Sequence, residues 1–218
     1  MEKPRQRISF GLMFLLISSV LAAQEPTEPK YPRFDVTPLL GYRTPMSFSI
    51  EPALQGTSPK VVIDAAAGYG CAFGVRFHDT EDVVEFRWTR QQSHTHLQDV
   101  SVMSSVQRVT LDQFHGDFTH EYIMEGWPVW ARPFIIGSVG ATHVAGSGNT
   151  EFTRFSFGIG GGVKLFFGKH FGFRTQAEWL PVVVSSQATV FCGGGCLVHI
   201  GGTLGSQGEV TAGPLLRF

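Results

Sequence analysis

The sequence predicts an all-β fold, an eight-stranded antiparallel up-and-down transmembrane β-barrel, and three observations support this. Apolar and polar residues alternate with a period of two in eight segments, which is the pattern of strands whose two faces meet different surroundings. Short and long links alternate between these segments, as in a meander that turns at two rims. The 218 residues include 26 Gly and 19 Phe, and only 16% are charged, against about 25% in ordinary soluble domains.

The composition also excludes two other classes of protein. A hydrophobic content of 43% with a net charge of −1 does not fit a disordered chain, which needs low hydrophobicity and high net charge. The chain has no surplus of basic residues that could neutralise phosphates. We therefore expect no nucleic-acid partner.

The N-terminus predicts export. A positively charged start is followed by an apolar stretch and then by small residues, which is the order of parts in a secretory signal peptide. The apolar stretch is shorter than the roughly 20 residues of a spanning helix. We expect residues 1–23 to be the signal peptide, 24–32 a Pro-rich linker and 33–218 the barrel domain. The parts of the signal are Lys3, Arg5 and Arg7, then residues 8–20, then Ala22 and Ala23, after either of which cleavage is expected.

The first two segments establish the pattern. Segment 33–43 has apolar or aromatic residues at even positions, beginning with Phe34. Segment 61–77 has them at odd positions, with Gly and charged residues between them. Each is predicted to be a strand with one apolar face.

The next three segments are 84–89, 113–122 and 129–144. The first two set aromatic residues against charged or polar ones. The phase of the third is the least clear, and we place Arg132 inward and Ile135 outward.

The last three segments are 154–167, 171–183 and 210–218. In the first of them, aromatic and aliphatic residues at odd positions face a row of Gly and polar residues at even positions. The other two repeat the alternation, and the last ends on Phe218. All eight segments are long enough to be strands.

The links between the segments predict the topology. Three are short and four are long, and the two kinds alternate along the chain, which indicates one tight rim and one elaborated rim. The short links are 78–82, 123–128 and 168–170, and the long ones are 45–60, 91–108, 145–152 and 185–208.

The polar face decides between two kinds of barrel. A soluble barrel such as a lipocalin has its apolar face inside, and a membrane barrel has it outside. Six acidic and six basic residues alternate with the apolar face, and such balance suits a closed interior, where charges have to be paired. We therefore predict a membrane barrel with an interior charge network. Its expected members are Asp35, Arg43, Asp64, Arg76, Glu85, Arg87, Asp117, Glu121, Lys164, Arg174, Glu178 and Arg217.

The C-terminus carries a family resemblance. In EVTAGPLLRF, apolar residues stand at alternate positions back from a terminal aromatic residue, namely at Val210, Ala212, Leu216 and Phe218. With the signal peptide and the eight strands, the chain resembles the bacterial outer-membrane β-barrels of the small eight-stranded OmpA/OmpX type. The resemblance implies a place in the bacterial outer membrane, contact with its lipid, and recognition of the last strand by the barrel-assembly machinery. Pro214 departs from the pattern because it cannot donate a ladder hydrogen bond.

Cysteine and histidine residues give weaker signals. Cys192 and Cys196 in FCGGGC form a candidate disulfide in an oxidising compartment, and half a zinc site is the alternative. Cys71 falls on the apolar face as an inert residue. His94 and His96 share one face of an extended segment, a spacing compatible either with a metal ion or with an ordinary polar strand end. We therefore assign no catalytic, metal or cofactor-binding residue and expect no cofactor.

The predicted function is a structural or surface-interaction role without catalysis. Paired charges would plug the lumen, and the long links would meet a surface ligand that the sequence does not identify. Two alternatives stay open, a narrow channel for ions or small solutes and a lipid-modifying enzyme. The His-x-Ser pattern of outer-membrane deacylases does not occur in the chain.

Overall fold

The computed structural model describes residues 33–49, 60–77, 80–98, 107–123, 125–146, 150–183, 188–192, 196–200 and 204–218. All of them belong to one compact unit, Tyr31–Phe218. The predicted signal peptide and linker lie outside the described residues and stay predictions. No described residue belongs to a helix long and apolar enough to cross a membrane.

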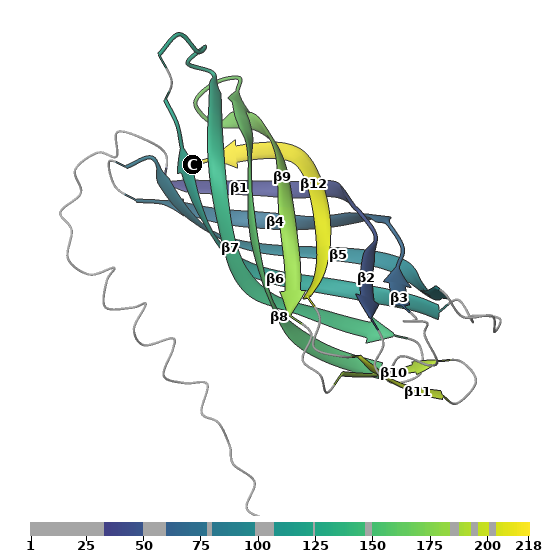
Figure 1. The fold of residues 1–218 in the computed structure, drawn as a ribbon. Coiled ribbons are helices and arrows are strands. Elements are labelled where there is room, and N and C mark those ends of the chain that lie inside the picture. Colours follow the sequence, from purple (N-terminus) through teal and green to yellow (C-terminus); the bar gives the residue numbers. More distant parts are fainter. Residues whose placement is uncertain are drawn as a thin grey trace, which may run out of the picture. The chain divides into compact units, whose positions relative to one another are not determined.

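Eight antiparallel strands close into a barrel (Figure 1), which confirms the predicted fold class. Each strand pairs with its neighbour in the chain's order, and β1 pairs with both β4 and β12, so that the ring has no free edge. A closed ring supplies every strand with two hydrogen-bonding partners. The barrel strands are β1 (Phe34–Arg43), β4 (Ala66–Arg76), β5 (Asp82–Gln98), β6 (Gln107–Glu121), β7 (Ala131–Gly146), β8 (Thr150–Phe166), β9 (Phe171–Val183) and β12 (Leu204–Arg217).

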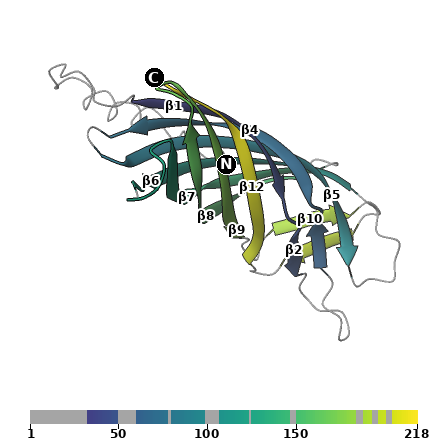
Figure 2. The same cartoon turned by 90° about the horizontal axis from the view of Figure 1, so that it is seen from above.

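The two ends of the barrel differ. At the terminus end, Phe34 and Phe218 exchange backbone hydrogen bonds of 3.0 and 2.8 Å. At the other end, called the distal end below, there are four further strands (Figure 2). Three of them lie within two segments that were predicted to be long links, and the fourth is the beginning of the predicted second strand. There β2 pairs with β3 and β3 with the distal part of β5, while β10 and β11 form a separate two-stranded sheet. These additional strands are β2 (Met46–Ser49), β3 (Lys60–Ile63), β10 (Ala188–Cys192) and β11 (Cys196–Ile200).

The predicted strand ends are wrong at several places on the distal side. Strand β5 continues to Gln98 and β6 begins at Gln107, so most of the expected link 91–108 is sheet. Residues 147–149 alone separate β7 from β8, whereas nine residues, 122–130, separate β6 from β7 at the terminus end. The strict alternation of short and long links is therefore wrong. In the distal part of β5, residues 91–98, polar side chains stand on both faces and hide the period of two.

The predicted second strand is interrupted, and its phase changes at the interruption. Asp64 and Ala65 separate β3 from β4. On the β4 side, Tyr69 is exposed as predicted, but on the β3 side Ile63 is buried although it shares the same parity. A local break between two strands reverses the faces of all residues beyond it.

Elsewhere the alternation holds along the barrel wall. Large apolar side chains point outward, as the exposed fractions of 72% for Leu40 and 64% for Ile159 show. The phase of β7 is as predicted, with Ile135 exposed and Arg132 on the inward side. The molecule therefore has an apolar outer surface and a polar interior, the reverse of a soluble barrel.

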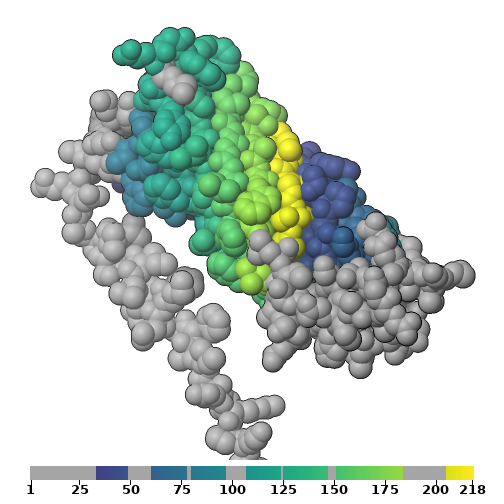
Figure 3. Space-filling view, in the orientation of Figure 1, coloured from purple at the N-terminus to yellow at the C-terminus, as the bar shows by residue number. Residues whose placement is uncertain are grey.

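The seam between β1 and β12 contains two facing prolines. Val36 pairs with Leu216 and Leu40 with Ala212, which places Pro38 opposite Pro214. Neither residue has an N–H, and the backbone pairing of β1 with β12 is interrupted between these two pairs. The seam is nevertheless closed, and the side chains of β12 lie directly beside those of β1 in the space-filling view (Figure 3).

Gly213 allows β1 and β12 to approach each other at this seam. A Cβ at Gly213 would lie only 2.9 Å from the carbonyl carbon of Pro38 and would overlap its oxygen. A Cβ at Gly137, on the outer face of β7, would meet nothing within 4 Å. Backbone atoms of Pro38 therefore occupy the space beside Gly213, whereas the space beside Gly137 is open.

We expect Gly213→Val to destabilise the barrel and Gly137→Val to have little effect. Overpacking at a closed seam costs about 1–3 kcal/mol. The temperature at which the protein changes its gel mobility on heating should fall for the first variant only. Equal transition temperatures for the two variants would contradict the close approach at the seam.

Candidate functional site

The interior of the barrel holds a charge network. Six carboxylates and six basic side chains are buried on the inward faces of the strands. They are Asp35, Glu85, Asp117, Glu121, Glu178 and Glu209, and Arg43, Arg76, Arg87, Lys164, Arg174 and Arg217. Eleven of these twelve are residues that the sequence placed in the network.

Glu121 is the centre of the network at the terminus end. Its Oε1 lies 2.7 Å from Nη2 of Arg76, 2.9 Å from Nζ of Lys164 and 3.4 Å from Nη2 of Arg217. Its Oε2 lies 3.5 Å from Nη1 of Arg132. One carboxylate from β6 therefore binds cations from β4, β7, β8 and β12, and charge-assisted hydrogen bonds of this kind are the strong ones.

Lys164 joins the terminus end to the middle of the barrel. Its Nζ is fully buried and contacts Oδ2 of Asp35 at 3.3 Å and Oε1 of Glu85 at 3.4 Å, besides Glu121. Arg174 Nη1 donates to the other oxygen of Glu85 at 2.6 Å. These contacts cross the lumen, because β8 neighbours neither β1 nor β5 in the sheet.

Arg87 is the corresponding cation in the middle of the barrel. Its guanidinium donates to both carboxylate oxygens of Glu178, and its Nε lies 2.9 Å from Oδ2 of Asp117. Glu178 also accepts a hydrogen bond of 3.1 Å from Nε2 of Gln176. Strand β5 is thereby connected across the lumen to β9 and sideways to β6.

Nearer the distal end the interior becomes less charged. Arg43 Nε donates to Oε1 of Glu209 at 2.9 Å, and the same guanidinium contacts Thr89. His115 Nε2 and Ser156 Oγ lie 2.8 Å apart. The amide of Gln207 lies 3.4 Å from that of Gln91.

A hydrophobic cluster fills the interior at the distal end. We call it the distal apolar layer. Its members come from barrel strands and from β2 and β3, so the additional strands contribute to it. They are Met46, Phe48, Ile63, Val109, Leu111, Val144 and Val182, with Phe152 packed against them.

One predicted member of the network is wrong, and one was missed. Asp64 is not inside, since its side chain is 43% exposed and its carboxylate lies 2.9 Å from Nδ1 of His96. The interruption between β3 and β4 turns it out of the barrel. Glu209 takes its place, and the balance of six against six is kept. Glu209 shares the parity of Thr211 and Arg217, so extending the last strand by one residue identifies it.

The sequence analysis also missed a polar cluster on the outer face. Arg90 binds Asp112 through two hydrogen bonds of 2.7 and 2.9 Å, and Trp88 Nε1 donates to the same carboxylate at 3.1 Å. The rings of Tyr69 and Trp88 meet edge to face at 6.0 Å. This cluster lies at the distal limit of the apolar outer surface on β5 and β6. Amphipathic aromatic side chains suit a membrane interface at such a position.

The remaining predicted residues are placed as follows. Val210, Leu216 and Phe218 are exposed on the outer face of β12, where Ala212 is half-buried, and their recognition by an assembly machinery stays a prediction. Cys192 pairs with Cys196 across β10 and β11, but their side chains lie outside the described part, so the disulfide stays a prediction. Cys71 is free and exposed on the outer face.

Among the described residues, the structure brings no third metal ligand of the expected kinds to the histidine pair. His94 is exposed, and His96 faces Asp64. Within the described ranges, no group of three or more His, Cys, Asp or Glu side chains is positioned to hold a metal ion.

Comparison with known proteins identifies the fold. No protein-family model and no curated protein sequence matches the chain. Among solved structures, Neisserial surface protein A superposes with a TM-score of 0.55 at 12% identity, over 85% of this chain and 97% of the other. Outer membrane protein OprG of Pseudomonas aeruginosa gives 0.56 at 12% identity, over 87% and 97%.

A third structure, outer membrane protein AlkL in lipid bilayers, gives a TM-score of 0.50 at 11% identity, over 90% of this chain and 95% of the other. At these identities the likeness concerns the fold. The chain has the fold of the small outer-membrane β-barrels.

The pair of Arg43 and Glu209 provides a test of the charge network. Removing one partner of a buried pair leaves an unpaired charge and costs about 3–5 kcal/mol, whereas replacing both with apolar residues costs far less. We expect Arg43→Met to lower the free energy of unfolding in urea by that amount, and Arg43→Met with Glu209→Leu to recover most of it.

The exposed Arg33 is the matched control, and Arg33→Met should leave unfolding unchanged. If the double variant is as unstable as the sum of the two single variants, the pair does not act as a unit.

Proposed function

We propose that this chain is an integral protein of the bacterial outer membrane with a closed lumen and a structural or surface-interaction role. Its outer surface of exposed aromatic and aliphatic side chains would contact lipid. Residues 1–23 would direct export and be removed, and the outward side chains of β12 would be bound by the barrel-assembly machinery. The fold, which is similar to that of small outer-membrane barrels, supports this location.

The closed lumen is proposed because the charged side chains inside it are paired. Every one of the twelve buried charged side chains of the network is at most 6% exposed. The ion pairs cross the lumen, and the distal apolar layer fills its outer end. Side chains are expected to fill the interior of an eight-stranded barrel, which leaves no room for a diffusion pore.

A narrow channel is the second candidate, because some buried polar atoms have no hydrogen-bond partner among the residues that the structure describes. Neither amide atom of Gln113 makes a hydrogen bond, and the hydroxyls of Thr119 and Thr211 are likewise without one. Such atoms are usually satisfied by ordered water. A file of water molecules along the wall would allow small ions to pass without opening the network.

Catalysis is the least supported role. The described part of the chain contains one Ser–His hydrogen bond, between Ser156 and His115, and both residues are at most 2% exposed inside the barrel. A lipid substrate on the outer surface has no access to this pair. Lipid A from cells with and without the gene should therefore give identical mass spectra, and a lost acyl chain would overturn this part of the proposal.

Planar-bilayer recordings test the closed lumen. We expect purified wild-type protein to insert without stable openings, because moving an ion through the network requires breaking buried pairs. Protein recovered from the same vesicles should show heat-modifiable gel mobility, which proves that it was folded. Stable openings that depend on solute size would favour the channel.

Fractionation of cells tests the location and processing. The mature protein should be found in the outer membrane, and its N-terminal residue should be Ala23 or Gln24. Protease added to intact cells should cleave within the distal links and leave the barrel strands protected. Retention in the cytoplasmic membrane with residues 1–23 attached would contradict the proposal.

A further inference from the structure

The apolar outer surface of the barrel is not equally tall on all sides. On β5 its outward residues are Val84, Phe86 and Trp88, and the next outward residues at either end are the polar Asp82 and Arg90. Asp82 and Arg90 are eight residues apart, which is about 26 Å along the strand and about 20 Å across a membrane at a strand tilt of about 40°. The apolar band of an outer-membrane barrel is about 25 Å tall. The band on β5 is therefore shorter than usual.

Strand β6 has the same two limits as its neighbour β5. In the ladder Asp112 lies opposite Arg90, and His120 lies opposite Asp82. The distal limit is the hydrogen-bonded pair of Arg90 and Asp112, and at the terminus end Nδ1 of His120 lies 2.7 Å from Oδ1 of Asp82. The ring of Tyr122 meets that of His120 edge to face at 4.8 Å. We call the outer faces of β5 and β6 between these two polar pairs the short wall.

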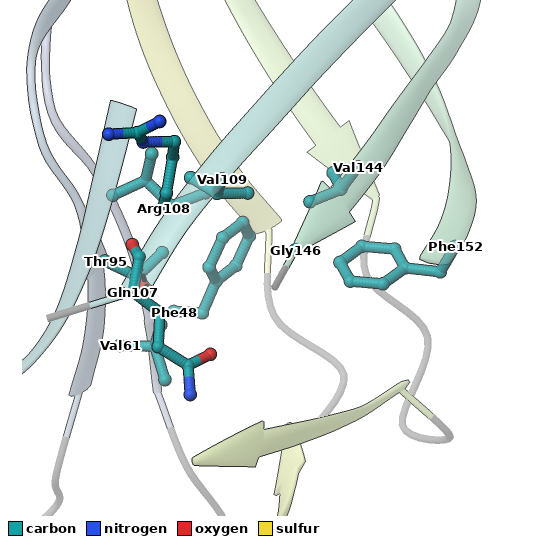
Figure 4. Close-up of a pocket in the computed structure, with 10 residues that line it drawn as sticks. Phe48, Val61, Thr95, Gln107, Arg108, Val109, Val144, Gly146 and Phe152 are labelled. Carbon is teal, nitrogen blue, oxygen red and sulfur yellow. Dashed lines mark hydrogen bonds between the residues drawn. The ribbon is translucent and has the colours of Figure 1, made fainter. Parts of the chain in front are cut away.

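The outer face stays polar beyond the distal limit of the short wall. Arg108 of β6 is exposed, and its guanidinium points away from Phe48 and Phe152, which line the apolar side of a pocket behind the strand (Figure 4). His94 lies opposite Arg108 in the ladder and is exposed as well. The pair of Arg90 and Asp112 is therefore the edge of the apolar surface and not a polar island within it.

The outer face of β8 is much taller. From Phe155 to Phe167 its outward residues have no polar side chain, and these two limits are twelve residues apart. This is about 40 Å along the strand and about 30 Å across the membrane. Trp179 of β9 pairs with Ile159 and belongs to the same surface. We call the outer face of β8 from Phe155 to Phe167, with Trp179, the tall wall, and it lies in the green surface of Figure 3.

A bilayer of one uniform thickness does not fit both walls. In hydrocarbon about 25–30 Å thick, a polar pair of the short wall would lie among the acyl chains. Tilting the whole barrel does not help, because it moves both limits of a wall together and leaves the height of that wall unchanged. A charged side chain in hydrocarbon is costly, whereas the thickness of a bilayer adapts at a much smaller cost for each ångström. The lipid, and not the protein, is therefore expected to yield.

We propose that the bilayer is thinned along the short wall and that this wall selects lipids with short acyl chains. The tall wall is bordered by longer chains, so that one barrel sorts lipids between its two sides. This inference rests on the membrane location in the proposed function and assigns a class of lipid to one face of the barrel.

Tryptophan quenching in vesicles tests the selection. The vesicles contain two phosphatidylcholines in equal amounts, with 14-carbon and 18-carbon chains, and in each sample one of the two carries bromine, which quenches a tryptophan in contact with it. Trp88 reports on the short wall and Trp179 on the tall wall, each as the single tryptophan of a variant whose other three are replaced with Phe. We expect the 14-carbon lipid to bind about twofold more strongly than the 18-carbon lipid at Trp88, and no more strongly at Trp179.

Two double replacements lengthen the short wall without leaving an unpaired charge. Arg90→Leu with Asp112→Leu removes the distal pair, and Asp82→Leu with His120→Leu removes the pair at the terminus end. Each should abolish the preference for the short chain at Trp88, because the apolar height then approaches that of the tall wall.

The matched control is Arg33→Leu with Glu125→Leu. It replaces one arginine and one acid that are exposed outside both walls, and the preference at Trp88 should stay about twofold. Heat-modifiable gel mobility shows that each variant is folded.

Equal chain-length preferences at Trp88 and Trp179 would overturn the proposal, as would a preference at Trp88 that survives both double replacements. Quenching of Trp88 by neither lipid would show that a protein, such as a second copy of this chain, covers the short wall, and would overturn it too. Equal preferences would leave the outer-membrane location intact. Recovery of the protein from another cell fraction would overturn the location without affecting the quenching.

Discussion

Charges buried inside this barrel have to be paired, and most of the architecture depends on that requirement. An isolated ionised side chain in such an interior costs several kcal/mol or more. Lys164 meets the requirement with carboxylates from three strands, β1, β5 and β6, none of which is its neighbour in the sheet. A slip of one residue in any of these strands would turn its carboxylate to the lipid side. The network therefore fixes the register of strands that share no backbone hydrogen bond.

Glycine on the inward face makes room for this network. A Cβ at Gly160 would lie 2.6 Å from Cγ of Glu178, and one at Gly162 would lie 2.8 Å from Cα of Gln176. Strand β8 thus yields its inward space to the long side chains of β9, including the glutamate that binds Arg87. The high glycine content is therefore related to the charge network, because inward glycines leave the space that the long charged side chains occupy.

The sequence was sufficient where a local rule applies and insufficient where contacts between distant strands decide. The period of two is local, and it located the eight barrel strands, the phase of β7 and eleven of the twelve buried charges. The interruption at Asp64 is not visible in that pattern, because Val61 and Ile63 continue the apolar parity of β4 while facing the opposite way. The pair of Arg90 and Asp112 was missed for a related reason, since each residue looks like an exposed polar side chain until β5 and β6 are aligned.

The distal apolar layer separates two sets of residues with different consequences for the protein. On the side of the layer toward the terminus end, each charged side chain of the network contacts oppositely charged side chains on other strands. A substitution at one of these positions therefore affects the stability of the whole barrel. On its distal side, Arg108 has no ion pair with any described residue, and the Thr95 hydroxyl donates a hydrogen bond of 3.3 Å to the Gln107 carbonyl. Substitutions at these positions should therefore affect folding less than substitutions in the charge network. The distal end can differ in sequence while the barrel stays closed, because the interactions that hold it closed lie on the other side of the layer.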